Sequence, residues 1–185
     1  MSVHRILILL FGISEVLLFI LKRSKSSSTK SRADRLSLLL FWITIPACLT
    51  LGGVIAENHI GLPADADWDN AGIVVFVVGF IIRWVSIVQL GSMFTVDVSI
   101  SSTHTLKTDG LYQLVRHPSY LGLVLIMAGI SLFMSNGLSS MMVVVSIFLV
   151  TNYRINVEEK ALTAEFGGQY ADYKKRVRKI VPWVY

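Results

Sequence analysis

Polar side chains that could do chemistry gather in the segment THTLKTDGLYQLVRHPSY (103–120). A compact group of them stands where this segment gives way to an apolar one: Arg116, His117, Pro118, Ser119 and Tyr120. Pro118 suits the first turn of a helix, because its missing N–H would have no partner there. It also biases the preceding residue toward extended geometry. We therefore expect a helix from 118, with backbone groups around its start free to bind a carboxylate or phosphate.

A turn precedes this corner, which we define as residues His117 to Tyr120. The pair Asp109-Gly110 is typical of a tight turn. Such a turn would fold His104 and Tyr112 back toward the corner.

The second polar segment is YRINVEEKALTAEFGGQYADYKKR (153–176). Arg154 and Glu158 are four residues apart and would share one face of a helix. That helix would carry Arg154 at the end of the last apolar segment and Glu158 one turn further out, and Gly167-Gly168 would end it. A surface ion pair worth ~0.3–0.5 kcal/mol is the simple alternative.

The elements that must position these residues are apolar helices. Hydrophobic residues make up 54% of the chain and charged residues 16%, against about 45–50% and 25% in soluble proteins. Segments 4–21, 36–56 and 71–90 are long enough to cross a hydrocarbon layer of ~30 Å. Segments 119–134 and 138–152 form a helical hairpin around SNG (135–137). The expected fold class is an all-α polytopic membrane protein with about five transmembrane helices.

Charge placement predicts the orientation. Six Lys or Arg lie in the linker 22–35, two in 91–118 and seven in the tail from 153, whereas 57–70 carries four acidic residues. The positive-inside rule then places the N-terminus outside and the C-terminus and polar face in the cytoplasm. The linker and KKRVRK (174–179) are expected to meet lipid headgroups, not nucleic acid.

Two charges fall inside the predicted spans. Glu15 and Arg83 would lie at similar depth and could form an ion pair. The alternative is that Arg83 extends toward the interface while Glu15 faces another polar group.

Several site classes find no support in the sequence. The single Cys permits no disulfide framework. GxGxxG, P-loop, HExxH and CxxC motifs are absent, so neither a common nucleotide site nor a metal is expected.

Taken together, the motifs resemble the isoprenylcysteine carboxyl methyltransferase family, integral membrane enzymes that use S-adenosylmethionine. The matching stretches run in order over roughly 80–185: HTL (104–106), G-x-Y (110–112), RHPSYLG (116–122), Asn136, R-x3-EE (154–159), EFGGQYADYKKR (165–176) and PW (182–183). RHPxY alone is shared with phospholipid N-methyltransferases and some sterol reductases. The combination at this spacing is more specific. The first two spans carry no family signature.

The resemblance implies roles for particular residues. Arg154 would hold the carboxylate of the substrate. S-adenosylmethionine, leaving as S-adenosylhomocysteine, would be bound by His104, Thr105, Leu106, Lys107, Tyr112, His117, Pro118, Ser119, Tyr120 and Glu158. Lys107 replaces an apolar residue of relatives, so only its backbone role carries over. Asp97 stands where eukaryotic relatives have an amide and is not counted in the site.

The implied architecture has two parts. Residues 1–70 hold two transmembrane helices and the basic cytoplasmic linker 22–35, and residues 71–185 form the methyltransferase core. Within that core, a cytoplasmic cofactor pocket would form between the 91–118 connection and the C-terminal helix.

The expected reaction is methyl transfer to the carboxylate of a lipophilic, prenylcysteine-like substrate at the membrane–cytosol interface. A carboxylate is already ionised at neutral pH, so the site must supply proximity and orientation and needs no metal. The expected partners are this acceptor and membrane lipids. N- or S-methylation of a phospholipid or another small lipophilic molecule is the alternative. A reductase and a non-enzymatic membrane scaffold are the other classes left open.

Overall fold

The computed structural model describes residues 2–22, 32–61, 68–96 and 105–181. Within them the protein is helical, with one isolated bridge between Val115 and Arg178 in place of a sheet. The elements are α1 (Val3–Leu21), α2 (Arg32–Glu57), α3 (Asp69–Leu90), the 3-10 turns η1 (Gly91–Met93) and η2 (Gly110–Gln113), α4 (Pro118–Leu132) and α5 (Gly137–Arg176). The all-α membrane fold is confirmed.

The predicted spans match these helices, with two differences. Among the described residues, α1, α2, α3 and α5 are long and apolar enough to cross a membrane, and α4 is a shorter apolar helix. Helix α2 begins at Arg32, inside the predicted linker. Helix α5 does not end at Gly167-Gly168: Gly167 (φ 50°, ψ −120°) kinks it, and the helix resumes to Arg176. A glycine tolerates this positive φ, so the chain bends there without stopping.

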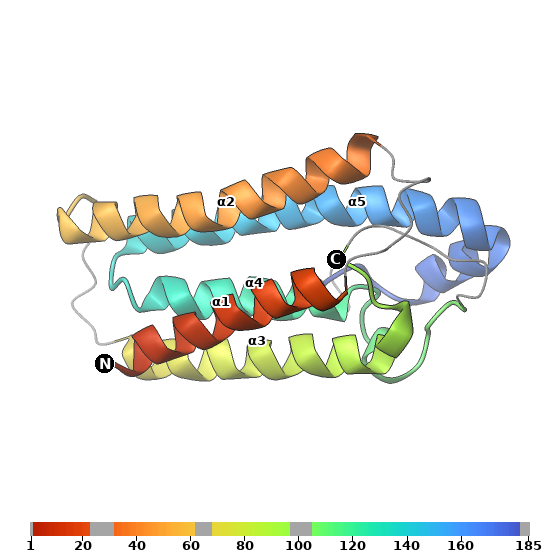
Figure 1. Ribbon diagram of the computed structural model, residues 1–185, viewed down its shortest axis with the longest axis horizontal. Coiled ribbons are helices and arrows are strands. Elements are labelled where there is room, and N and C mark those ends of the chain that lie inside the picture. Colours follow the sequence, from red (N-terminus) through yellow and green to blue (C-terminus); the bar gives the residue numbers. More distant parts are fainter. Residues whose placement is uncertain (1, 23–31, 62–67, 97–104, 182–185) are drawn as a thin grey trace.

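The helices form an elongated bundle whose two ends differ (Figure 1). The N-terminus, the end of α2, the start of α3 and the turn between α4 and α5 lie at one end. The start of α2, η1, η2, the start of α4 and the kinked extension of α5 lie at the other, which we call the site end. The described residues on either side of the 97–104 stretch, the start of α2 and the end of α5 therefore lie at a common end.

Helices α3 and α4 touch through glycines. Gly79 on α3 lies against the backbone of α4, where an added Cβ would come within 2.7 Å of Gly122 O and Ile126 N. An added Cβ on Gly122 would come within 2.6 Å of Arg83 N and Gly79 O. Small residues allow membrane helices to approach this closely, and backbone atoms have no room to yield. This contact holds Arg83 beside the first turn of α4.

The turn at the opposite end is fastened by one side chain. Asn136 is the N-cap of α5, and its Oδ1 accepts a hydrogen bond from Ser139 N at 3.0 Å. Its Nδ2 donates to Ile60 O, just beyond α2, at 3.1 Å. A capping side chain satisfies an otherwise unpaired helix N–H, and here it also joins two connections of the bundle.

The glycine contact yields a prediction for stability. Gly79→Ala should lower the free energy of unfolding by about 1–3 kcal/mol, because the methyl group has only backbone to displace. The measurement is reversible unfolding in detergent micelles, followed by circular dichroism. Gly12→Ala is the matched control, since nothing lies within 4 Å of a Cβ there. Equal stability of the two variants would contradict close packing of α3 on α4.

Candidate active site

One cavity at the site end is lined by residues of α1, α2, α3, α4 and α5 and of the connection between α3 and α4. It is lined by most of the predicted site residues: Thr105, Leu106, Lys107, Tyr112, His117, Ser119, Tyr120, Arg154 and Glu158. Pro118 stands at the first position of α4, as predicted, with His117 as the N-cap. His104 and Asp97 lie outside the described residues. The structure thus brings together residues from positions 105 to 158.

The backbone around the start of α4 is used differently from the prediction. The N–H of Arg116 donates to Arg178 O at 2.8 Å, and that of His117 donates to Lys179 O at 3.1 Å. The N–H groups of Tyr120 and Leu121 both donate to His117 O. The expectation that these groups are free for a ligand is wrong for these four, because the segment after α5 and the helix itself occupy them.

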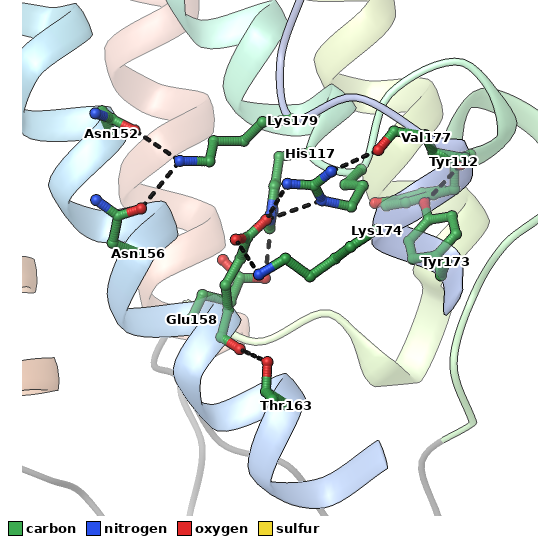
Figure 2. Close-up of polar contacts among 12 residues, drawn as sticks. Tyr112, His117, Asn152, Asn156, Glu158, Thr163, Tyr173, Lys174, Val177 and Lys179 are labelled. Atoms are coloured by element: carbon green, nitrogen blue, oxygen red, sulfur yellow. Dashed lines mark hydrogen bonds and ion pairs between the residues drawn. The ribbon is translucent and has the colours of Figure 1, made fainter. Parts of the chain in front are cut away.

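Glu159 is the residue on which this corner depends, and sequence reasoning overlooked it beside Glu158. Arg116 Nε and Nη2 donate to Glu159 Oε1 at 2.9 and 2.7 Å, and His117 Nε2 lies 3.3 Å from the same oxygen. Lys174 Nζ lies 3.2 Å from Glu159 Oε2 (Figure 2). A buried carboxylate with this many cationic neighbours stabilises only while all are present. The signal in the sequence that could have pointed to Glu159 was the second acid of the R-x3-EE motif.

The basic segment 174–179 makes contacts within the protein. Lys174 reaches Glu159, and Lys179 Nζ donates to Asn152 Oδ1 at 3.2 Å and Asn156 Oδ1 at 3.0 Å (Figure 2). Ile180 is 1% exposed, so the chain after α5 is anchored by an apolar side chain as well. This segment holds the corner from the side opposite α3.

Tyr112 forms a wall of the cavity. Its hydroxyl donates to Ser86 O at 3.3 Å, and its own carbonyl accepts from the Tyr173 hydroxyl at 2.6 Å. Burial raises the pKa of the Tyr112 phenol above its ordinary value, and the negative charge of Glu158 raises it further. The phenol therefore stays protonated and keeps its donor role.

The side chain of Lys107 is held by Asp109. Its Nζ lies 3.0 Å from Asp109 Oδ1, in the turn that leads to Tyr112. The same hydrogen bond holds the pKa of the Asp109 carboxyl below its usual range. The backbone role of Lys107 toward the cofactor stays a prediction.

Arg154 is buried and tied to α2. Its guanidinium Nη1 donates to Asp34 Oδ1 and to Ser37 Oγ, both at 2.6 Å, and Nη2 donates to Val96 O at 2.7 Å. The side chain is 3% exposed, so the alternative of a surface pair with Glu158 is wrong. The sequence places Asp34 in the linker that is expected to meet headgroups, and this prediction is wrong for Asp34, which is 2% exposed inside the protein.

Glu158 is the accessible carboxylate of the cavity. Its side chain is 31% exposed, and His117 Nδ1 lies 4.0 Å from its Oε1. The Tyr120 hydroxyl interacts with both Glu158 and Arg154. The cavity therefore presents an accessible anion and a buried cation, with the Tyr120 phenol in the same lining.

The two charges within the spans form an ion pair, the first of the two alternatives that the sequence left open. Arg83 Nε and Nη2 donate to the two oxygens of Glu15, each at 2.6 Å. Arg83 Nη1 also donates to Ser119 O at 3.2 Å and Ser119 Oγ at 3.1 Å. Glu15 and Arg83 line the same cavity as Arg154. In the described ranges, His, Cys, Asp and Glu form no group of three that could hold a metal ion.

A family model for the isoprenylcysteine carboxyl methyltransferase (ICMT) family matches residues 72–164, about half of the 185-residue chain. The chain belongs to this family. The match includes α3, α4 and most of α5, and therefore the corner, Arg154 and Glu158. It excludes α1 and α2.

Named relatives support the assignment. The chain is 34% identical over 117 residues to protein-S-isoprenylcysteine O-methyltransferase B of Arabidopsis thaliana, covering 62% of this chain and 59% of that protein. It is 34% identical over 116 residues to protein-S-isoprenylcysteine O-methyltransferase of Rattus norvegicus, covering 62% and 41%. The chain thus matches less than two thirds of the length of these relatives.

A solved structure shares the fold over nearly the whole chain. The eukaryotic intramembrane Ras methyltransferase ICMT superposes with a TM-score of 0.69 and 25% identity, covering 98% of this chain and 65% of that one. The ICMT fold therefore includes α1 and α2.

The cluster around Glu159 yields the next prediction. Glu159→Ala should lower the free energy of unfolding by about 3–5 kcal/mol, because it leaves the buried Arg116 guanidinium without its counter-charge. It should also release the 177–180 segment and speed tryptic cleavage at Arg176 and Arg178. Unfolding curves and mass spectrometry of timed digests measure both effects.

Glu165→Ala is the control for this variant, because Glu165 is an exposed acid on the same helix. Its stability should stay within about 0.5 kcal/mol of wild type. Matching digestion patterns for the two variants would show that Glu159 does not hold the segment.

Proposed function

We propose that this protein transfers a methyl group from S-adenosylmethionine to the carboxylate of a lipophilic, prenylcysteine-like acceptor at the membrane–cytosol boundary. The observation that carries the proposal is one continuous cavity with two kinds of wall. Thr105, Tyr112, His117 and Glu158 form its polar part, and apolar side chains of α1 and α2 form the other: Leu18, Leu38, Phe41 and Trp42. Membership in the ICMT family and the names of the relatives support the same reaction.

The polar wall fits the proposed cofactor. Glu158 presents a carboxylate that could pair with an α-ammonium group, and aromatic side chains such as Tyr112 and Phe166 offer faces to an adenine. The cofactor would supply the methyl group on a sulfonium. The walls would exclude water and hold the two reactants in line, which is the whole catalytic requirement when the nucleophile is already ionised.

Arg154 lines the same cavity and is proposed to hold the acceptor carboxylate. An Arg–carboxylate pair fixes direction as well as distance, because the guanidinium donates from two nitrogens in one plane. Tyr120 would then separate the acceptor from Glu158, so that the two anions do not repel each other directly.

A second candidate rests on the contact between Arg154 and Asp34. Because Arg154 already has a carboxylate partner, the site also suits an acceptor without one. That acceptor would be a phospholipid or another small lipophilic molecule, methylated on nitrogen or sulfur.

Transfer of labelled methyl from S-adenosylmethionine to N-acetyl-S-farnesylcysteine separates these candidates. A carboxyl methyl ester releases labelled methanol on base treatment, and N- or S-methyl products do not. We expect base-labile label with the purified protein. Label that stays on a phospholipid after base treatment, with none on the prenylcysteine, would favour the second candidate.

Two variants assign the roles in that assay. Arg154→Ala should abolish measurable transfer while S-adenosylhomocysteine still raises the unfolding temperature. Glu158→Ala should weaken S-adenosylhomocysteine binding by about 10–100-fold, as expected for loss of a hydrogen bond to a charged group. The reverse pattern would exchange the two roles.

The orientation is proposed from the basic residues at the site end, which would face the cytoplasm. In a Cys48→Ser background, Ala164→Cys should resist a membrane-impermeant maleimide added outside intact cells, and Asn58→Cys should react. Both positions are exposed, at opposite ends of the bundle. Labelling of Ala164→Cys alone would invert the proposed orientation.

A further inference from the structure

Arg154 is held by an element that the family match does not reach. The match begins at residue 72, whereas Asp34 and Ser37 lie in the first turns of α2. Arg154 Nη1 donates to Asp34 Oδ1, Ser37 Oγ and, at 3.2 Å, Asp34 O. All three contacts converge on one nitrogen of the guanidinium, and both α2 residues are buried.

These contacts approach Arg154 from behind the cavity. The described residues that line the cavity include Arg154, Leu38 and Val96, but neither Asp34 nor Ser37. The carboxylate of Asp34 therefore contacts the guanidinium outside the cavity lining. Arg154 itself lines the cavity, where the acceptor is proposed to bind.

Helix α1 fastens the other side of the same arginine. Arg154 Nη2 donates to Val96 O, and Val96 N in turn donates to Lys22 O at 3.0 Å. Lys22 Nζ donates to Gly91 O at 2.9 Å, which ties the end of α1 to the end of α3. The described chain on either side of segment 23–31 thus lies close to Arg154: Lys22 on one side, and the first turns of α2 on the other.

The geometry points to Asp34, assisted by Ser37, as the positioning residue that orients Arg154 toward the acceptor carboxylate. This inference rests on the proposed function. A free arginine side chain loses rotamer entropy when it is fixed, and a buried charge needs a partner. Asp34 meets both requirements before the acceptor arrives, so the binding site is preorganised.

The opposite role for Asp34 would be to compete with the acceptor carboxylate for Arg154. If Asp34 occupied the place of the acceptor, its removal would improve acceptor binding. Its position behind Arg154 and outside the cavity lining favours the positioning role. The sign of the effect on KM separates the two.

The test compares N-acetyl-S-farnesylcysteine with its carboxamide, a neutral analogue that cannot be methylated, in the membrane-embedded protein. For Asp34→Ala we expect KM for the carboxylate to rise at least about tenfold and kcat to fall, from the loss of a hydrogen bond to a charged group. The inhibition constant of the carboxamide and the affinity for S-adenosylhomocysteine should change less than about threefold. Asp34→Asn keeps the acceptor oxygen and should restore KM to within about threefold of wild type.

Two further variants keep the test decisive if Asp34→Ala does not fold. Ser37→Ala removes a smaller contact and should raise KM for the carboxylate by about fivefold, with the carboxamide unaffected. Glu57→Gln removes one negative charge from the other, exposed end of α2 and should leave both constants unchanged.

The outcomes distinguish this inference from the proposed function. A lower KM in Asp34→Ala or Asp34→Asn, or equal losses for carboxylate and carboxamide, would overturn the positioning role alone. So would an unchanged KM in Ser37→Ala and Asp34→Ala together. Absence of transfer to the carboxylate by the wild-type protein would overturn the proposed function and this role with it.

Discussion

Three arginines buried among apolar helices organise this protein, and each takes its counter-charge from a different element. Arg83 of α3 pairs with Glu15 of α1, Arg154 of α5 pairs with Asp34 of α2, and Arg116 pairs with Glu159 of α5. Moving one charge away from its partner would leave another uncompensated in a medium of low dielectric constant. The helices are therefore fixed relative to one another at the depth where the cavity lies. Apolar packing alone would not fix that depth, because helices with apolar surfaces can shift along one another in lipid.

The glycine contact between α3 and α4 places one of these arginines, Arg83, beside α4. Because Gly79 and Gly122 let the two backbones meet, Arg83 reaches the first turn of α4 and donates to Ser119. The start of α4 is thus held from the membrane side by Arg83. From the opposite side it is held by Glu159 and by the backbone pairing of Arg116 and His117 with residues 178–179. A corner held from both sides is a suitable wall for a site that is proposed to work by orienting its substrates.

The sequence predicted the helices and the gathering of the site residues, because both follow from local patterns. Apolar length marked the spans, Pro118 marked the start of α4, and the family motifs marked Arg154 and Glu158. The prediction failed where a residue's role depends on a distant partner. Asp34 lies in a stretch rich in Ser, Lys and Arg, so composition predicted an exposed linker at a position where the acid is buried. Glu159 differs from Glu158 only in the helix face it occupies. The contacts of Lys174 and Lys179 within the protein were not predicted, because a basic pattern does not reveal its acceptors.

The distance along the chain between paired residues has a consequence for folding. The cavity and its supports join Glu15, near one end of the sequence, to Lys179, near the other. Contacts of such long sequence separation form late, because the loops between them must close first. The helices can therefore insert one by one while the site stays unassembled until residues 177–180 have joined the corner. A chain interrupted during synthesis would be a membrane protein with its spans in place and no working site.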